Sequence, residues 1–177
     1  MGTQQLILLA INVVGGVAVI GSYVLGLQGQ PGGMNALWGG VPENIRPLYG
    51  ISMLISAAGY LAVVYFLLFR LAPDSVNFGG RFGFGLFYVI VIGILLPSAF
   101  WMPLTNVYVA GASAGVWIAI RTVLALVGLA SIALVWALAS LHAQQGGTAY
   151  WLAVFGSGYF AFHTAVLDAI IWAALFK

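Results

Sequence analysis

Five long apolar stretches constrain what this chain can fold into more than any other feature of its sequence. Each has roughly 20 residues or more, which is enough for an α-helix to cross the ~30 Å hydrocarbon layer of a bilayer. Charged residues make up 5% of the 177 residues, far below the ~25% of soluble domains. The sequence therefore predicts an all-α integral membrane protein, a bundle of five transmembrane helices at residues 6–27, 47–70, 82–104, 115–141 and 149–176.

The connections between these stretches are short except for the first, loop 28–46, which contains several glycines and prolines. Long connections in compact domains are often functional, so we predict that this loop is a functional loop or lid. No linker or repeat divides residues 1–177, which we interpret as one domain. An odd number of spans puts the termini on opposite sides: side A holds the N-terminus, and side B holds loop 28–46, loop 105–114 and Lys177. Lys and Arg are shared equally between the sides, so the orientation stays open, as does the identity of the membrane.

The composition excludes several classes of function. The net charge of +2 is dispersed along the chain without a basic patch, so we expect the lipid bilayer as a partner and no nucleic acid. The absence of cysteine removes disulfides and thiolate ligands. The sequence contains no phosphate-binding glycine loop, no His-Glu-x-x-His motif and no Ser/His/Asp set at one expected depth. We therefore predict no catalytic residue and no metal site.

Two opposite charges lie inside the predicted helices at similar depths. An ionisable residue in a transmembrane helix costs about 2.5–3.5 kcal/mol on insertion scales, so it normally faces a partner inside the bundle. At about 1.5 Å per residue, Asp168 lies ~13 Å and Arg121 ~9 Å from side B. The two helices are antiparallel neighbours, so we predict an Arg121–Asp168 ion pair inside the membrane. This pair either only fastens the two helices together or also lines a cavity.

Aromatic residues gather at the same depth as this pair. Aromatic walls around one or two charges are typical of a pocket for a flat or rigid apolar molecule with a polar group. Trp and Tyr also form the aromatic belt at membrane interfaces, and that alternative stays open. The predicted ligand-binding residues are Trp38, Tyr49, Trp101, Pro103, Trp117, Arg121, Asp168 and Trp172.

The last predicted helix carries two polar residues, and its expected geometry separates them. On an α-helix Phe160, Thr164, Asp168 and Trp172 share one face because of their i, i+4 spacing. At 100° per residue, His163 lies about 140° around the axis from Asp168. We therefore expect no local acid–base couple between His163 and Asp168.

His163 needs another partner in this interpretation. It lies ~20 Å along its helix from an end, as does Tyr60 on the second predicted helix, so we predict a Tyr60–His163 hydrogen bond. Ligation of haem or a metal by His163 is the alternative. His142 lies at the side A boundary, which is too different in depth for a two-histidine axial arrangement within one chain.

Several motifs resemble those of the translocator protein family, also called tryptophan-rich sensory proteins. The end of the third predicted helix carries Trp-Met-Pro-Leu at 101–104, similar to the family's Trp-x-Pro-Leu motif. The fifth carries Leu-Asp-Ala-Ile-Ile-Trp at 167–172, with Asp168 where the family has Asn. The second begins with Pro-Leu-Tyr at 47–49, followed by Met53. The number of helices and the long first loop are also similar.

The resemblance implies a binding protein for tetrapyrroles such as porphyrin or haem, for sterols or for similar lipophilic molecules. It implies a pocket near side B that the first loop closes, and often a homodimer. The alternative is a small accessory subunit of a larger membrane complex, in which the buried charges are purely structural. An enzyme that uses Asp168 or His163 as a proton carrier is a third alternative.

Overall fold

The computed structural model describes residues 1–28, 33–141 and 146–176, and it is an all-α bundle of five membrane helices. Each helix is long and apolar enough to cross a bilayer, so the fold class and the multi-pass membrane location are confirmed. The first four helices are α1 (Thr3–Gln28), α2 (Arg46–Phe69), α3 (Gly85–Ala110) and α4 (Ala114–Ser140). The fifth is one continuous rod of α5 (Thr148–Ala161), the π-helix η5 (Phe162–Trp172) and α6 (Ala173–Leu175).

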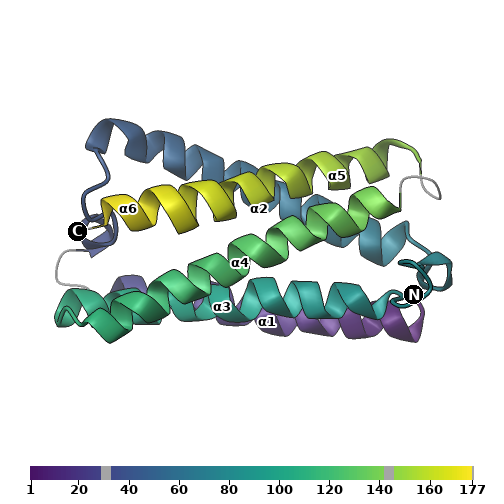
Figure 1. The fold of residues 1–177 in the computed structure, drawn as a ribbon, viewed down its shortest axis with the longest axis horizontal. Coiled ribbons are helices and arrows are strands. Elements are labelled where there is room, and N and C mark those ends of the chain that lie inside the picture. The colour runs from purple at the N-terminus through teal and green to yellow at the C-terminus, as the bar shows by residue number, and fades with distance from the viewer. Residues whose placement is uncertain (29–32, 142–145, 177) are drawn as a thin grey trace.

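The helices lie roughly along one axis, with the two ends of the chain at opposite ends of the bundle (Figure 1). Helix α3 packs between α1 and α4, while α2 packs against α5. Helix α4 also contacts both α5 and η5, so it joins the group of α1, α3 and α4 to the pair of α2 and the fifth helix. Side A is the end of the N-terminus, and side B is the end of α6.

The predicted end of the third helix is wrong. Helix α3 continues to Ala110 with Pro97 and Pro103 inside it, so residues 105–110 are helical and the predicted loop 105–114 is shorter. Membrane helices tolerate proline because neighbouring groups bond the backbone atoms that it leaves without partners. Thr105 follows Pro103 in this helix, and its hydroxyl donates to the Trp101 carbonyl at 2.8 Å.

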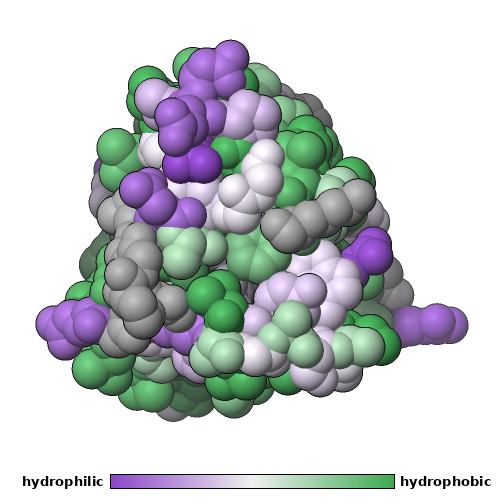
Figure 2. Space-filling view, turned by 90° about the vertical axis from the view of Figure 1, so that its left-hand side faces the viewer, coloured by the Kyte–Doolittle hydropathy of each residue, from purple (hydrophilic) through white to green (hydrophobic). Residues whose placement is uncertain are grey.

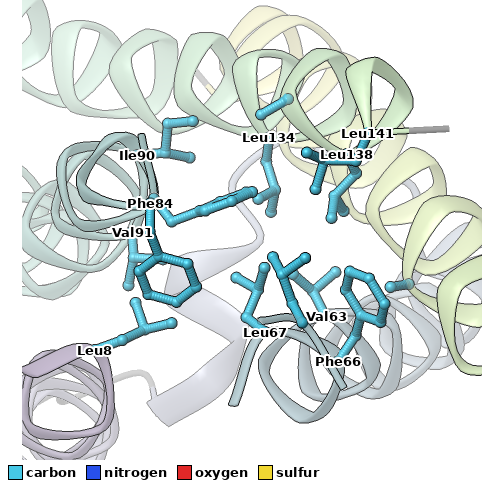
Figure 3. Packing of buried hydrophobic residues seen from close by; sticks show 14 of the residues in the cluster. Leu8, Val63, Phe66, Leu67, Phe84, Ile90, Val91, Leu134, Leu138 and Leu141 are labelled. Atoms are coloured by element: carbon cyan, nitrogen blue, oxygen red, sulfur yellow. The ribbon is translucent and has the colours of Figure 1, made fainter. Parts of the chain in front are cut away.

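A dense hydrophobic core, the side A core, fills the half of the bundle near the N-terminus (Figure 3). The 71–84 connection contains the 3-10 helix η3 (Pro73–Ser75) and inserts Phe78 and Phe84 into this core. The side chains that the core encloses almost completely include Leu8, Phe66, Phe84, Phe87, Leu134, Leu138 and Tyr150. The buried residues of this core include no Asp, Glu, His, Lys or Arg.

Helices α2 and α5 touch backbone to backbone where two glycines meet. A Cβ atom on Gly156 would lie 2.8 Å from the Gly59 Cα atom, which is closer than real Cβ atoms approach. Only glycine permits this crossing, which lets membrane helices pack through their backbones. Beyond it, toward side B, the bundle is hollow.

Residues 33–45 cover the side B end. They form two 3-10 helices, η1 (Gly33–Leu37) and η2 (Glu43–Ile45), and pack Val41 against Tyr49, Ile120 and Trp172. Figure 2 looks onto this end, where hydrophilic residues collect at the edges of a largely hydrophobic surface. The Glu43 side chain, 90% exposed, is one of the charges here.

Candidate ligand-binding cavity

A cavity of about 370 Å³, the aromatic cavity, lies in the side B half and is lined by all five helices and residues 37–38. Its wall is mostly apolar, with aromatic rings from every helix except α4. These rings are Tyr23, Trp38, Tyr49, Trp101, Phe160 and Trp172. The polar side chains that reach it are Ser56, Ser98, His163, Thr164 and Asp168.

Five of the eight predicted ligand-binding residues line this cavity: Trp38, Tyr49, Trp101, Asp168 and Trp172. The aromatic rings form a connected wall, with ring centroids 5.4 Å apart for Trp101 and Trp172, and 5.9 Å apart for Trp38 and Tyr49. These separations are typical of favourable edge-to-face aromatic pairs. The sequence motifs therefore converge on one place in the structure.

The other three predicted residues lie outside the cavity. Pro103 is exposed on α3. Trp117 is one layer behind the wall, where its ring stacks on Phe176 at 5.9 Å and lies 6.3 Å from Trp172. Arg121 is exposed on the outer face of α4.

The predicted Arg121–Asp168 ion pair is wrong. Helix α4 turns Ile120, Leu124 and Val127 inward, and Arg121 points outward beside them. A long Arg side chain near a helix end can extend to the membrane interface and keep its charge in water. Asp168 instead lines the cavity with its side chain 32% exposed, and its Oδ1 lies 3.6 Å from the His163 Nε2.

The π-helix explains why His163 and Asp168 lie close together, although the 100° per residue of an α-helix would place them on different faces. Its hydrogen bonds run from residue i+5 to residue i, as in the bond from the Ala173 N–H to the Asp168 carbonyl. Residues five apart therefore lie closer together around the axis than on an α-helix, and His163 joins Phe160, Thr164 and Asp168 at the cavity wall. Single π-helical turns occur often at functional sites.

The other ring nitrogen of His163 leads away from the cavity to α2. The Ser52 Oγ lies 2.8 Å from His163 Nδ1, and the Tyr159 hydroxyl donates to Ser52 Oγ at 3.0 Å. A Ser/His/Asp set at one depth, which we did not expect from the sequence, is therefore present. Ser52 opens onto a second, shallower groove between α2 and the fifth helix, so the serine and the carboxylate lie on opposite sides of the histidine.

The predicted Tyr60–His163 hydrogen bond is also wrong. The Tyr60 hydroxyl donates to the Asn12 Oδ1 at 2.7 Å, which ties α2 to α1. Tyr49, one turn before Ser52, donates to the Leu167 carbonyl at 2.6 Å and so bonds the π-helical backbone. The polar contacts that α2 makes with the π-helical part of the fifth helix come from Tyr49 and Ser52 near its start.

One buried polar atom at the cavity has no hydrogen-bond partner among the described residues: the indole Nε1 of Trp101. Trp172, which packs against it, donates its own indole N–H to the Leu37 carbonyl at 3.1 Å. A buried donor without a partner costs about 1–3 kcal/mol. The Trp101 N–H therefore needs an acceptor that the described chain does not supply.

The cover over the cavity is fastened to the end of the fifth helix. The Gly40 N–H donates to the Leu175 carbonyl at 3.1 Å, in addition to the Trp172–Leu37 bond. Gly39 has a φ of +51° and packs so tightly on the Phe176 ring that a Cβ atom would lie 2.6 Å from it. Residues 33–45 thus meet α6 through backbone bonds and a glycine contact.

Haem or metal ligation by His163 would require one of these contacts to break, because Nδ1 faces Ser52 and Nε2 faces Asp168. Among residues 1–28, 33–141 and 146–176, no three His, Asp or Glu side chains come together as a metal site. His142 lies outside the described residues.

Sequence reasoning missed Tyr23 and His163 as cavity residues. Tyr23 interrupts the aliphatic first span, and its ring lies 5.5 Å from that of Trp101. The signal for His163 was its spacing of five residues from Asp168, which only a π-helix turns into proximity.

No protein-family model, curated protein or solved structure gives a significant match to this chain. The resemblance to translocator proteins therefore stays a prediction that rests on the motifs at 47–49, 101–104 and 167–172.

Proposed function

We propose that this protein binds a lipophilic small molecule in the aromatic cavity, inside the membrane. The observation that carries the proposal is the cavity itself, about 370 Å³ with an aromatic and aliphatic wall and a few polar groups. Ligand sites are usually concave, mostly apolar and about 300–1,000 Å³ in volume. Lipophilic molecules reach such a site by partitioning into the bilayer.

The unpartnered N–H of Trp101 supports a ligand with a hydrogen-bond acceptor. The Trp101 ring lines the cavity, and a ligand oxygen would satisfy its enclosed indole Nε1 after a rotation of the side chain. Residues 33–45 act as the lid, because Leu37 and Trp38 form part of the wall.

The volume narrows the ligand classes that the resemblance implies. At about 370 Å³ the cavity is near the small end of the range for ligand pockets. A sterol has fewer heavy atoms than a tetrapyrrole, so the sterol-like shape fits better, and a porphyrin requires the lid to open.

The test is calorimetric titration of the detergent-purified protein with cholesterol and with protoporphyrin IX. We expect saturable binding of at least one probe, and about tenfold weaker binding in Trp101→Phe, which removes the N–H and keeps an aromatic ring. Trp136→Phe is the matched control, because Trp136 is 55% exposed and packs on Phe78 in the other half. If neither probe binds, or both variants lose affinity equally, the cavity is not their site.

A second candidate, an accessory subunit of a membrane complex, is favoured by helix α1. Only Leu8 and Gly26 of its 26 residues are buried. Its outward residues, which include Val14, Val17 and Leu25, leave one face for lipid or for a partner helix. Stable co-purification with other membrane chains, lost on Val17→Trp, supports this role, while a monodisperse single chain in mild detergent excludes it.

A further inference from the structure

The described residues that line the aromatic cavity include one acidic group and no Lys or Arg. Asp168 is the only carboxylate among its lining residues, and its side chain is open to the cavity rather than enclosed by protein. A carboxylate in an apolar membrane site is costly unless a positive charge or good hydrogen bonds compensate it. The partner of Asp168 thus decides what the cavity can hold.

The basic side chains of the described chain lie elsewhere. Arg46 is fixed at the rim by the Val41 carbonyl and by Glu43, at 3.0 and 3.9 Å. Arg121 is on the outside of α4, and Arg70 and Arg81 are at side A, at the other end of the bundle. None of them pairs with Asp168.

His163 compensates Asp168 only in part. Because Tyr159 donates to Ser52, the Ser52 hydroxyl is left to donate to Nδ1, so that Nδ1 accepts and the ring proton is on Nε2. This tautomer is neutral and directs an N–H at Asp168, but at 3.6 Å the contact is longer than a normal hydrogen bond. The relay explains how His163 is satisfied without a positive charge, which leaves Asp168 without a cation among the described residues.

Aromatic rings surround the space next to this carboxylate. Tyr23, Trp101 and Trp172 follow one another with centroid separations of 5.5 and 5.4 Å, and Trp38 and Tyr49 line the same cavity. The faces of such rings attract ammonium groups, most strongly where water is excluded. A carboxylate among aromatic rings is therefore complementary to an organic cation and repels an anion.

We propose that the ligand of the aromatic cavity is a compact lipophilic cation, an ammonium group on a rigid apolar body. The ammonium group bonds to Asp168 among the rings, and the apolar body contacts aliphatic lining residues such as Val19, Met53 and Val127. This inference rests on the proposed function and names the class of ligand.

Three probes of nearly equal shape test it: 1-aminoadamantane, 1-adamantanol and adamantane-1-carboxylate. Each is titrated calorimetrically into the detergent-purified protein at neutral pH. We expect the amine to bind about tenfold or more tightly than the alcohol, since charge-assisted hydrogen bonds exceed neutral ones by this order, and the carboxylate to bind most weakly.

Three variants locate the preference. Asp168→Asn should reduce amine affinity to that of the alcohol, while its unchanged alcohol affinity shows that the cavity is still folded. Asp168→Glu should restore the preference for the amine. Glu43→Gln, which removes a carboxylate from the exposed rim, should change neither affinity.

The outcomes separate the two proposals. Equal binding of amine and alcohol, or an amine preference that survives in Asp168→Asn, overturns the cation inference and leaves the cavity as a binding site. Binding of cholesterol or protoporphyrin IX, with no binding of the amine, also overturns the cation inference and leaves the cavity as a binding site. If none of the five probes binds saturably, both proposals fail.

Discussion

The two halves of the bundle are built from the same five helices but differ in how they are filled. In the side A half, aromatic and aliphatic side chains interlock without a carboxylate, histidine, lysine or arginine among the buried residues of the core. In the side B half the helices surround a cavity, and His163 and Asp168 lie in its wall. This difference indicates that overall hydrophobicity places the chain in the bilayer. The few polar residues and the local helix geometry determine which half contains the cavity.

The boundary between the halves lies where α5 gives way to η5. Before it, Gly59 and Gly156 hold α2 and α5 together by their backbones. After it, the wider π-helical turn brings His163 and Asp168 to one face and receives bonds from Tyr49 and Ser52. The close crossing and the side A core thus form a rigid base for the cavity.

The largest expected effect is a difference in stability between two leucine-to-alanine substitutions on one helix, one in each half of the bundle. Leu134 and Leu124 of α4 are both buried, but Leu134 is in the side A core and Leu124 lines the cavity. Leu134→Ala should cost about 3–5 kcal/mol of stability because it opens a new void. Leu124→Ala should cost about 2 kcal/mol or less, because it extends an existing space and removes fewer contacts. Thermal unfolding in detergent, followed by circular dichroism, measures both; equal losses would break the comparison.

The next effect tests the boundary. Gly156→Ala should destabilise the protein by about 2–3 kcal/mol, because its methyl group meets the backbone of α2 and neither helix can yield cheaply. Gly158→Ala is the control two residues away, with no atom within 4 Å of the new Cβ, and should be neutral or stabilising. Similar stabilities of the two variants would show that α2 and α5 do not cross this closely.

A smaller effect is expected from the polar relay of the hollow half. Ser52→Ala removes the partner of both His163 Nδ1 and the Tyr159 hydroxyl, and should cost about 1–3 kcal/mol. Tyr159→Phe removes only the outer donor and should cost ~1 kcal/mol. In the double variant the losses should be less than additive, since the residues share one chain of hydrogen bonds. Strict additivity would show that the relay does not form.

The smallest effect concerns the charge that lies outside the cavity. Arg121→Gln should change stability by less than ~0.5 kcal/mol, because Arg121 has no ion pair with Asp168 to lose. Asp168→Asn combined with Arg121→Gln should behave as the sum of the single variants. A large coupling energy would restore the ion pair that the sequence predicted.

The sequence predicted the helices well, because long apolar segments with few charges can satisfy their backbone hydrogen bonds inside a membrane in few other ways. The first, second and fourth helices begin and end within about three residues of the prediction. The third was ended too early, at residue 104, whereas the helix continues to Ala110 with Pro103 inside it.

The site was predicted in part for a similar reason. Aromatic residues near one helix end converge when the helices pack, so Trp38, Tyr49, Trp101 and Trp172 were found together. Which face Arg121 presents, and which residues meet across the fifth helix, depends on helix rotation and on the π-helical turn. Helix rotation and the π-helical turn cannot be predicted from the depth of a residue in the membrane. The angle of 100° per residue, which holds for an α-helix, was wrong for the π-helix from His163 onward.

The most direct test of the hollow half as a ligand site is the indole N–H spectrum of the protein labelled with ¹⁵N-tryptophan, recorded during titration with 1-aminoadamantane, cholesterol and protoporphyrin IX. With any ligand that enters the aromatic cavity, the Trp101 resonance should shift and saturate, while that of Trp136 in the other half stays in place. A Trp101 resonance that does not move with any of the three, or that moves in parallel with Trp136, would contradict the account.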